Sequence, residues 1–427
     1  MNTTSLLERR YRTLGQHSPL FYDKPLQIVR GEGVWLYAAD GTRYLDAYNN
    51  VPHVGHCHPR VAEAIAKQAR TLNTHTRYLD ETIINYAERL LSTFQPSLNR
   101  IFFTCTGSES NELALRIARE CTGHMGVISS GFAYHGNTAA VAQISSLFTP
   151  PAKQGPYVRS VPVPDPYRDR NGRSDEELAD AYVKDLQRAI DDFERNGVKL
   201  AAVLFCTAFS SEGLPTLPQG YLAKAAQTAR AAGGLFIADE VQAGFGRFGS
   251  HMWGHDLHQA VPDIVTMGKP MGNGHPLAGV VTTTDLQERF ASENMYFNTF
   301  GGNEVSAAAG TAVLDVLRDE RLLENAQRVG DYVLTGMRAL QNKYPVIGDV
   351  RGKGMFFGIE LVSDRKTRKP ADAATKAIVE GMRARGVLIS RIGPHDNILK
   401  IRPPMVFTTE NADVLLTTLD AVLSEKT

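Results

Sequence analysis

The heptapeptide Phe236-Ile237-Ala238-Asp239-Glu240-Val241-Gln242 joins an apolar run to an acidic residue. Its apolar first half predicts a buried strand, and Asp239 stands where that strand ends. In open parallel sheets, ligands bind in the crevice outside the carboxyl ends of the strands. Asp239 is therefore a candidate binding residue, although an acid at this place also suits the N-cap of a following helix.

Similar runs recur through the middle of the chain and alternate with helical patterns. The segment 101–104 predicts a strand, and the helix after it carries Leu113, Ile117 and Cys121 at four-residue steps on one apolar face. This alternation predicts an α/β fold with a mostly parallel sheet that helices cover on both faces. The segment 150–175, rich in Pro, Arg and Asp, predicts a long surface loop. The other apolar runs are 125–129, 201–206, 235–238 and 263–267, and 221–232 is one of the helical stretches between them.

The pattern changes after about residue 310, where long helices lead into short strands. Because 427 residues exceed one ordinary core, two domains are expected. We predict a large domain over 61–310, a smaller α+β domain over 311–427, and an N-terminal segment over 1–60 that packs with the small domain. That segment includes a predicted hairpin turning at Asp40-Gly41. The predicted C-terminal elements are helices at 304–318, 322–344 and 409–424 and strands at 346–351, 355–362, 387–390 and 398–401.

Composition excludes several classes of protein. Hydrophobic residues make up 43% and charged residues 22%, as in soluble globular proteins. The formal net charge is zero, so bulk electrostatics favours neither nucleic acid nor an anionic membrane. The polar stretch 1–11 lacks the apolar core of a secretory signal, and runs such as 277–281 are far too short to span a membrane. We therefore expect a cytoplasmic protein without metal, with reduced thiols at its scattered cysteines, Cys57, Cys105, Cys121 and Cys206.

The segment Thr106-Gly107-Ser108-Glu109-Ser110-Asn111 follows a predicted strand and opens a helix. Gly107 permits close approach to the backbone, and free N–H groups at a helix start attract anions. Ser108 adds a hydroxyl donor. The pattern suits a phosphate-binding site, but many helices begin with Gly-Ser for capping reasons alone.

The segment Thr266-Met267-Gly268-Lys269-Pro270-Met271-Gly272-Asn273-Gly274 puts a lysine at a strand end, before a Gly-rich turn. The amine of Lys269 could form an imine with an aldehyde cofactor and, when released, carry a proton. Taken alone, Lys269 also suits a solvated surface position. Together, the helix start at 106–111, Asp239 and Lys269 offer contacts for the phosphate, pyridine nitrogen and aldehyde of pyridoxal 5′-phosphate (PLP).

In their order and spacing, these motifs resemble the class III aminotransferases, which are fold-type I PLP enzymes. The resemblance runs through nearly the whole chain. It implies a fold-type I transferase, with a large PLP-binding domain and a smaller α+β domain built from both ends of the chain. The further segments that carry it are Ala133-Tyr134-His135-Gly136, 237–247 and Phe300-Gly301-Gly302-Asn303.

The resemblance implies a role for each matching residue. Lys269 forms the Schiff base with PLP, and Asp239 pairs with the pyridine nitrogen. Thr299 reaches the cofactor phosphate from the other subunit, so the family implies a homodimer with shared active sites. Taken alone, Tyr134 also suits a core aromatic position, and His135 a structural one. The other implied contacts are Gly107 and Ser108 at the phosphate, Tyr134 on the ring face with His135 beside it, and Gln242 near the phenolic oxygen.

Several segments resemble one branch of the family, the ethanolamine-phosphate and 5-phosphohydroxylysine phospho-lyases. Asn49-Asn50-Val51 and the segment 393–405 discriminate best, whereas Gly-His-Cys-His-Pro at 55–59 is general to class III. Many class III aminotransferases place an arginine three residues before a Pro-Pro pair, where it grips the substrate carboxylate. Here that residue is Lys400, a compact charge that suits a substrate without a carboxylate or with a phosphate, although it could also simply face solvent.

Two departures fit this reading. Cys206-Thr207-Ala208 replaces a Glu-containing segment common in the family, and Ser211 stands where some relatives have the glutamate that pairs with the arginine. Glu212 could substitute locally. A phospho-lyase also needs cations around the leaving phosphate, and the same residues could equally be ordinary surface charges. The candidates for this role are His53, Arg77, Lys400 and Arg402.

We therefore predict a PLP-dependent phospho-lyase that eliminates phosphate from a small phosphorylated amine, most simply O-phosphoethanolamine. The products would be acetaldehyde, ammonia and phosphate. The sequence leaves 5-phosphohydroxylysine open as the substrate. The main alternative is a class III aminotransferase that moves an amino group from an ω-amine to a keto acid. A more remote one is a non-catalytic PLP-binding protein.

Overall fold

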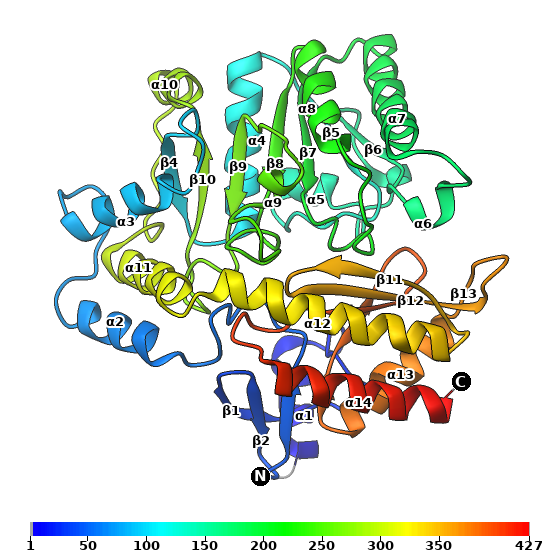
Figure 1. Cartoon of the computed structure of the whole chain (residues 1–427). Coiled ribbons are helices and arrows are strands. Elements are labelled where there is room, and N and C mark those ends of the chain that lie inside the picture. The colour runs from blue at the N-terminus through cyan, green and yellow to red at the C-terminus, as the bar shows by residue number, and fades with distance from the viewer. Residues whose placement is uncertain (1–2, 427) are drawn as a thin grey trace.

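A seven-stranded sheet forms the centre of the computed structural model, which describes residues 3–426 (Figure 1). Its strand order is β4-β10-β9-β8-β7-β5-β6, and β10 alone runs antiparallel to its neighbours. The prediction of a mostly parallel sheet is confirmed. Its strands are β4 (Arg100–Thr104), β5 (Gly126–Ser130), β6 (Val158–Val161), β7 (Leu200–Cys206), β8 (Leu235–Asp239), β9 (Ile264–Met267) and β10 (Ala278–Thr282).

Helices cover both faces of this sheet because each buried strand presents apolar side chains in both directions. Ile237 of β8 packs in the cluster that α4 (Gly107–Thr122) covers with Leu113 and Ile117. Its neighbour Phe236 packs in the main core with α7 (Asp175–Arg195) and α8 (Tyr221–Ala231). Successive side chains of a strand point to opposite faces, so both layers are anchored by the same short segment.

The C-terminal part of the chain forms a second sheet, antiparallel, in the order β11-β12-β16-β15. In Figure 1 the long helices α12 and α14 lie beside it, below the central sheet. The predicted C-terminal helices and strands are therefore confirmed as elements. They are α11 (Glu304–Asp319), α12 (Leu322–Lys343), β11 (Ile347–Lys353), β12 (Phe356–Asp364), β13 (Lys369–Pro370), α13 (Asp372–Ala384), β15 (Ser390–Ile392), β16 (Ile398–Ile401) and α14 (Thr409–Lys426).

The N-terminal sheet joins residues from both ends of the chain. The predicted hairpin is present as β2 (Trp35–Ala38) and β3 (Arg43–Asp46), after β1 (Ile28–Glu32). On its other edge β3 pairs in parallel with β14 (Val387–Leu388). The domain boundaries at residues 60 and 310 stay a prediction, and the outermost residues of the predicted segments 1–60 and 311–427 lie outside those that the structure describes.

The structure corrects the expected loop at 150–175. Within it, Val158 and Val161 are buried in the edge strand β6, which pairs with β5. A four-residue edge strand leaves a weak apolar signal, and the surrounding Pro and Arg residues obscured it. The remaining elements are α1 (Thr3–Leu14), α2 (Pro59–Ala69), α3 (Glu81–Leu91), α5 (Ala139–Ile144), η1 (Pro151–Lys153), α6 (Pro166–Asp169), α9 (Gly254–Leu257) and α10 (Thr284–Glu293). Across residues 3–426, none of the helices has the length and apolar character needed to cross a membrane.

Candidate active site

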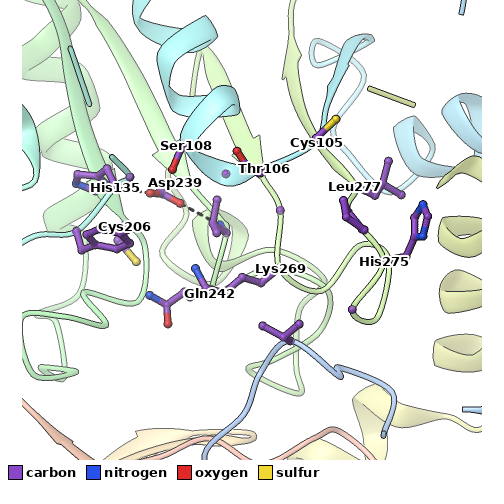
Figure 2. A pocket seen from close by; sticks show the side chains of 18 residues that line it. Cys105, Thr106, Ser108, His135, Cys206, Asp239, Gln242, Lys269, His275 and Leu277 are labelled. Atoms are coloured by element: carbon purple, nitrogen blue, oxygen red, sulfur yellow. Dashed lines mark hydrogen bonds and ion pairs between the residues drawn. The ribbon is translucent and has the colours of Figure 1, made fainter. Parts of the chain in front are cut away.

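A cavity of about 310 Å³ opens at the carboxyl ends of the central strands (Figure 2). Cys206, Asp239 and Thr266 stand opposite one another on the adjacent parallel strands β7, β8 and β9, so the ends of these strands meet at one edge. All seven residues predicted to contact the cofactor within one chain line this cavity: Gly107, Ser108, Tyr134, His135, Asp239, Gln242 and Lys269. The other lining residues are Val51, Cys105, Thr106, Gly136, Cys206, Val241, Gly268 and 274–277.

Asp239 is held by donors on three sides. Its Oδ2 accepts hydrogen bonds from His135 Nδ1 at 2.7 Å and from Asn111 Nδ2 at 3.0 Å. Its Oδ1 accepts from the backbone N–H of Val241 at 3.0 Å. All three partners donate to Asp239, which favours its ionised form. The carboxylate can therefore accept a further hydrogen bond from a ligand in the cavity. The position suits a protonated ring nitrogen.

The start of α4 also lines the cavity, where it forms a cradle suited to an anion. Thr106 caps the helix in a capping box with Glu109, which leaves the first-turn amides near Gly107 and Ser108 free for a ligand. Gly136, with φ of 142°, closes against this turn, where a Cβ atom would lie 2.5 Å from Ser108 Oγ. The absence of a side chain at Gly136 therefore keeps the cradle open. The fit is to a phosphate group.

Lys269 follows β9 in a tight turn, and Figure 2 shows its side chain extending into the cavity beside Gln242. Asn273 ties this turn to the N-terminal segment, because it accepts from Val54 N at 2.9 Å and donates to Gly55 O at 2.8 Å. Burial, and then the charge of Arg402, lower the pKa of Lys269. A lowered pKa increases the fraction of Lys269 whose amine is unprotonated, and only this form can attack an aldehyde or take up a proton.

Two more cations lie close to Lys269. Lys400 on β16 is 4% exposed, and its Nζ donates to Ser210 O at 2.9 Å, so the alternative that it faces solvent is wrong. Arg402 donates to Tyr48 O at 2.9 Å and to the Gln242 side chain, and its guanidinium stacks over the Tyr48 ring. Burial lowers the pKa of Lys400, and the charges of Arg402 and Lys269 lower it further.

Glu212 lies beside this cation pair, where the sequence could not place its side chain. It is buried, accepts from Ser130 Oγ at 2.5 Å and from Ser211 N at 2.9 Å, and acts electrostatically on Lys400. Burial raises the pKa of Glu212. The carboxyl group of Glu212 thus lies near Lys400, one residue after Ser211, where some relatives have a glutamate.

The structure contradicts His53 as a cation for the substrate phosphate. Both ring nitrogens are engaged away from the cavity, with Nε2 2.7 Å from Phe245 O and Nδ1 3.0 Å from Arg247. Burial, and then the charge of Arg247, lower the pKa of His53 far below its usual value. The ring is neutral and structural, because a buried arginine already supplies the positive charge there.

Arg77 and Thr299 lie outside the cavity of their own chain and are exposed. They belong to one surface, because the Arg77 guanidinium lies over the ring of Phe297 at 4.0 Å. Exposed apolar side chains surround them, an arrangement that marks interaction surfaces. We call this surface the apolar patch; it comprises the segments 72–84 and 295–300, with the exposed side chains of Leu72, Tyr78, Leu79, Ile84, Met295, Phe297 and Phe300.

Some residues of the site have no sequence signal that marks them as ligand contacts, and Cys206 and Val51 are two that line the cavity. Cys206 and Val51 stood in quoted segments, but nothing in the sequence orients a cysteine or valine toward a ligand. Asn111 does not line the cavity but donates to Asp239, and it carried a usable signal because it follows Gly107 by four residues and so shares its helix face. Burial raises the pKa of Cys206 to about 12, so its thiol stays protonated at neutral pH.

Comparisons with known proteins show which family the chain resembles. The family model described as aminotransferase class-III matches residues 21–423. A phospholyase from Arthrobacter, solved in complex with phosphoethanolamine, is 50% identical, with a TM-score of 0.95 over 98% of this chain and 99% of that one. The Caenorhabditis elegans ethanolamine-phosphate phospho-lyase homolog 1 is 39% identical over 98% of this chain and 93% of its own length.

A further relative carries the name of a transaminase. The Arabidopsis thaliana alanine–glyoxylate aminotransferase 2 homolog 2, described as mitochondrial, is 42% identical over 98% of this chain and 87% of its own length. The expected α/β fold of type I is confirmed by the family match and by the structural similarity. The chain belongs to the class III aminotransferase family of PLP-dependent enzymes.

Proposed function

We propose that this protein is a PLP-dependent phospho-lyase that acts on a small phosphorylated amine, O-phosphoethanolamine. The observation that carries the proposal is that two buried basic side chains, Lys400 and Arg402, lie close to Lys269, which lines the cavity. Lys400 replaces the arginine that grips carboxylates in many relatives. The phosphoethanolamine bound to the 50% identical Arthrobacter phospholyase supports the same class of substrate.

The electrostatics of these cations suits a doubly charged leaving group. Burial lowers the pKa of Lys400 and of Arg402, and for Lys400 the charge of Arg402 adds to this effect. A bound phosphate would reverse that repulsion and favour the protonated side chains. Positive groups fixed in place around a departing phosphate stabilise the charge that develops on it. Lys400 and Arg402 are therefore the proposed phosphate-side residues, and His53 is no longer among them.

The residues that line the cavity fit PLP. Gly107 and Ser108 would hold its phosphate, Asp239 its ring nitrogen and Lys269 its aldehyde carbon, as the open cradle and the acceptor geometry suggest. Tyr134 would cover the ring with His135 beside it, and Gln242 would lie near the phenolic oxygen. When bound, the cofactor supplies a sink for the electron pair left at the amine-bearing carbon.

Lys269 would have two tasks in this proposal: its amine would hold the aldehyde carbon of the cofactor, and, once free, the same amine would remove one proton from the amine-bearing carbon of the substrate. The neighbouring carbon–oxygen bond then breaks, and phosphate leaves with the bonding electron pair toward Lys400 and Arg402. The remaining unsaturated amine takes up a proton and reacts with water, which gives acetaldehyde and ammonia. No keto acid is consumed.

We further propose a homodimer in which the apolar patch of one subunit completes the site of the other. Exposed Thr299 would reach the partner's cofactor phosphate, and exposed Arg77 would approach the partner's substrate phosphate. Support comes from the exposure of both residues outside their own cavity and from the large apolar side chains around them. Arg77 is already oriented by its contact with Phe297.

Incubation with O-phosphoethanolamine tests the proposal. We expect equal amounts of inorganic phosphate and acetaldehyde without any keto acid, and neither product with Lys269→Ala. Phosphate release no greater than in this control would refute the phospho-lyase function. 5-Phosphohydroxylysine, tested in parallel, should react more slowly, because Lys400 replaces the residue that grips a carboxylate.

The second candidate is a class III ω-aminotransferase, which the name of the Arabidopsis relative favours. Conversion of pyruvate to alanine at the expense of an ω-amine, without phosphate release, would support it. A protein that binds PLP but shows no spectral change with any amine would instead be non-catalytic.

The cytoplasm remains our proposed compartment for this protein.

A further inference from the structure

Asn111, in the first turns of α4, connects the loop at His135 with the ends of the neighbouring strands β8 and β9. Its side chain is fully buried. Nδ2 donates to Asp239 Oδ2 at 3.0 Å and to the backbone carbonyl of His135 at 2.7 Å. Oδ1 accepts from the hydroxyl of Thr266 at 2.7 Å. Every polar atom of this amide therefore has a partner.

These contacts determine which way the amide points. Both neighbours of Nδ2 are acceptors, so a flipped amide would place its oxygen against a carboxylate and a carbonyl. The Thr266 hydroxyl supplies the hydrogen that Oδ1 requires. Thr266 is itself fixed, because it lies on β9 directly opposite Asp239 of β8. The hydroxyl thus holds the amide in the one orientation that gives Asp239 a donor.

Asp239 in turn has little freedom to rotate. Asn111 and His135 hold Oδ2, and Val241 N holds Oδ1. One acceptor direction of Oδ1 remains for a ligand. Removal of the Asn111 amide would leave the carboxylate with one side-chain donor instead of two and with freedom to turn.

We propose that Asn111 and Thr266 are positioning residues, which orient Asp239 so that it accepts the N–H of the PLP ring and keeps that nitrogen protonated. The inference rests on the proposed binding of PLP and not on the reaction that follows. Groups that hold a functional carboxylate in its productive geometry act through that carboxylate rather than on the ligand itself. Removal of either side chain should therefore reduce the protonation of the ring nitrogen without affecting contacts with the rest of the cofactor.

The experiment uses PLP labelled with ¹⁵N at the ring nitrogen and a 1-deaza analogue with carbon in its place. The ¹⁵N chemical shift and the affinity of the cofactor-free protein for both compounds are measured in wild type and in four variants. Asn111→Leu removes the amide, Thr266→Val removes the hydroxyl, and Thr266→Ser restores it. Thr282→Val is the matched control, because Thr282 is equally buried in the same sheet but bonds to Asp263 O at 2.9 Å.

We expect Asn111→Leu to move the ¹⁵N shift toward the unprotonated value and to weaken PLP affinity by about tenfold. Thr266→Val should do so to a smaller extent, while Thr266→Ser and Thr282→Val match wild type. Affinity for the deaza analogue should stay equal throughout. An unchanged shift in both Asn111→Leu and Thr266→Val, or an equal loss of affinity for both compounds, would overturn the inference. A wild-type protein that binds no PLP would overturn the proposed function, and this inference with it.

Discussion

Lys400 Nζ donates a hydrogen bond to the backbone carbonyl of Ser210, 2.9 Å away, although the two residues are 190 positions apart in the chain. Ser210 belongs to the turn that follows β7, and Lys400 to β16 of the C-terminal sheet. The turn also carries Glu212. The lysine that distinguishes this chain from many aminotransferases is therefore held at a defined place near Lys269 and Arg402.

Substitution of Lys400 separates a role in substrate binding from a role in stability. Lys400→Met should lower kcat/KM for phosphoethanolamine by about 100-fold, mainly through KM, because a buried charge facing the phosphate is lost. Phosphate release at varied substrate concentration measures this. The free energy of unfolding should not fall, since a buried lysine with a lowered pKa opposes folding below its ordinary pKa.

Lys224→Met is the matched control, because Lys224 pairs with Asp180 on the surface. It should leave KM unchanged. Lys400→Arg should retain part of the phospho-lyase activity and gain turnover of amines that carry a carboxylate. If Lys400→Met kept the wild-type KM, Lys400 would have no part in binding the phosphate.

Mixed dimers test whether Arg77 acts on the partner's site. Lys269→Ala and Arg77→Ala should each be nearly inactive alone. In a hybrid dimer, the site with intact Lys269 would receive intact Arg77 from the Lys269→Ala subunit. Random mixing should therefore restore about one quarter of the wild-type phosphate release. If Arg77 acted within its own chain, the mixture would stay inactive.

Gly136 tests the cradle at the start of α4. Gly136→Ala would place a Cβ atom 2.5 Å from Ser108 Oγ and should weaken PLP affinity by about tenfold. Titration of the cofactor-free protein with PLP measures this. Gly172→Ala is the control for backbone strain, since Gly172 has φ of 83° but a Cβ there would meet nothing within 4 Å. Equal affinities of the two variants would contradict a role for Gly136 in keeping the cradle open.

His53 should affect stability in a pH-dependent way. Its pKa is lowered in the folded protein, so near pH 6.5 this histidine binds a proton in unfolded chains but not in folded ones. The free energy of unfolding should therefore fall as pH decreases below about 6.5, by up to about 1.4 kcal/mol per pH unit for this residue. Urea unfolding between pH 7 and pH 5 should show a shallower fall for His53→Asn. The same slope in both proteins would contradict a neutral, buried His53.

The sequence could indicate which residues line the cavity because these residues follow short local patterns. Gly107 begins a helix, Asp239 ends a strand and Lys269 lies two residues beyond one, and parallel strands bring such ends to one edge. The short edge strand β6 was missed for the opposite reason. Its pairing with β5 depends on a neighbour distant in sequence, and four residues carry too little pattern of their own.

Short motifs were enough to indicate the family, the alternation of strands and helices, and the residues that fit PLP. Which charged side chains come close to Lys269 became clear only from the three-dimensional fold. It buried Lys400 and Arg402 beside Lys269, turned His53 toward Phe245 and Arg247, and left Arg77 on the surface. The physical reason is that burial and charged neighbours, which decide whether a side chain acts as a cation, come from segments far apart in the chain.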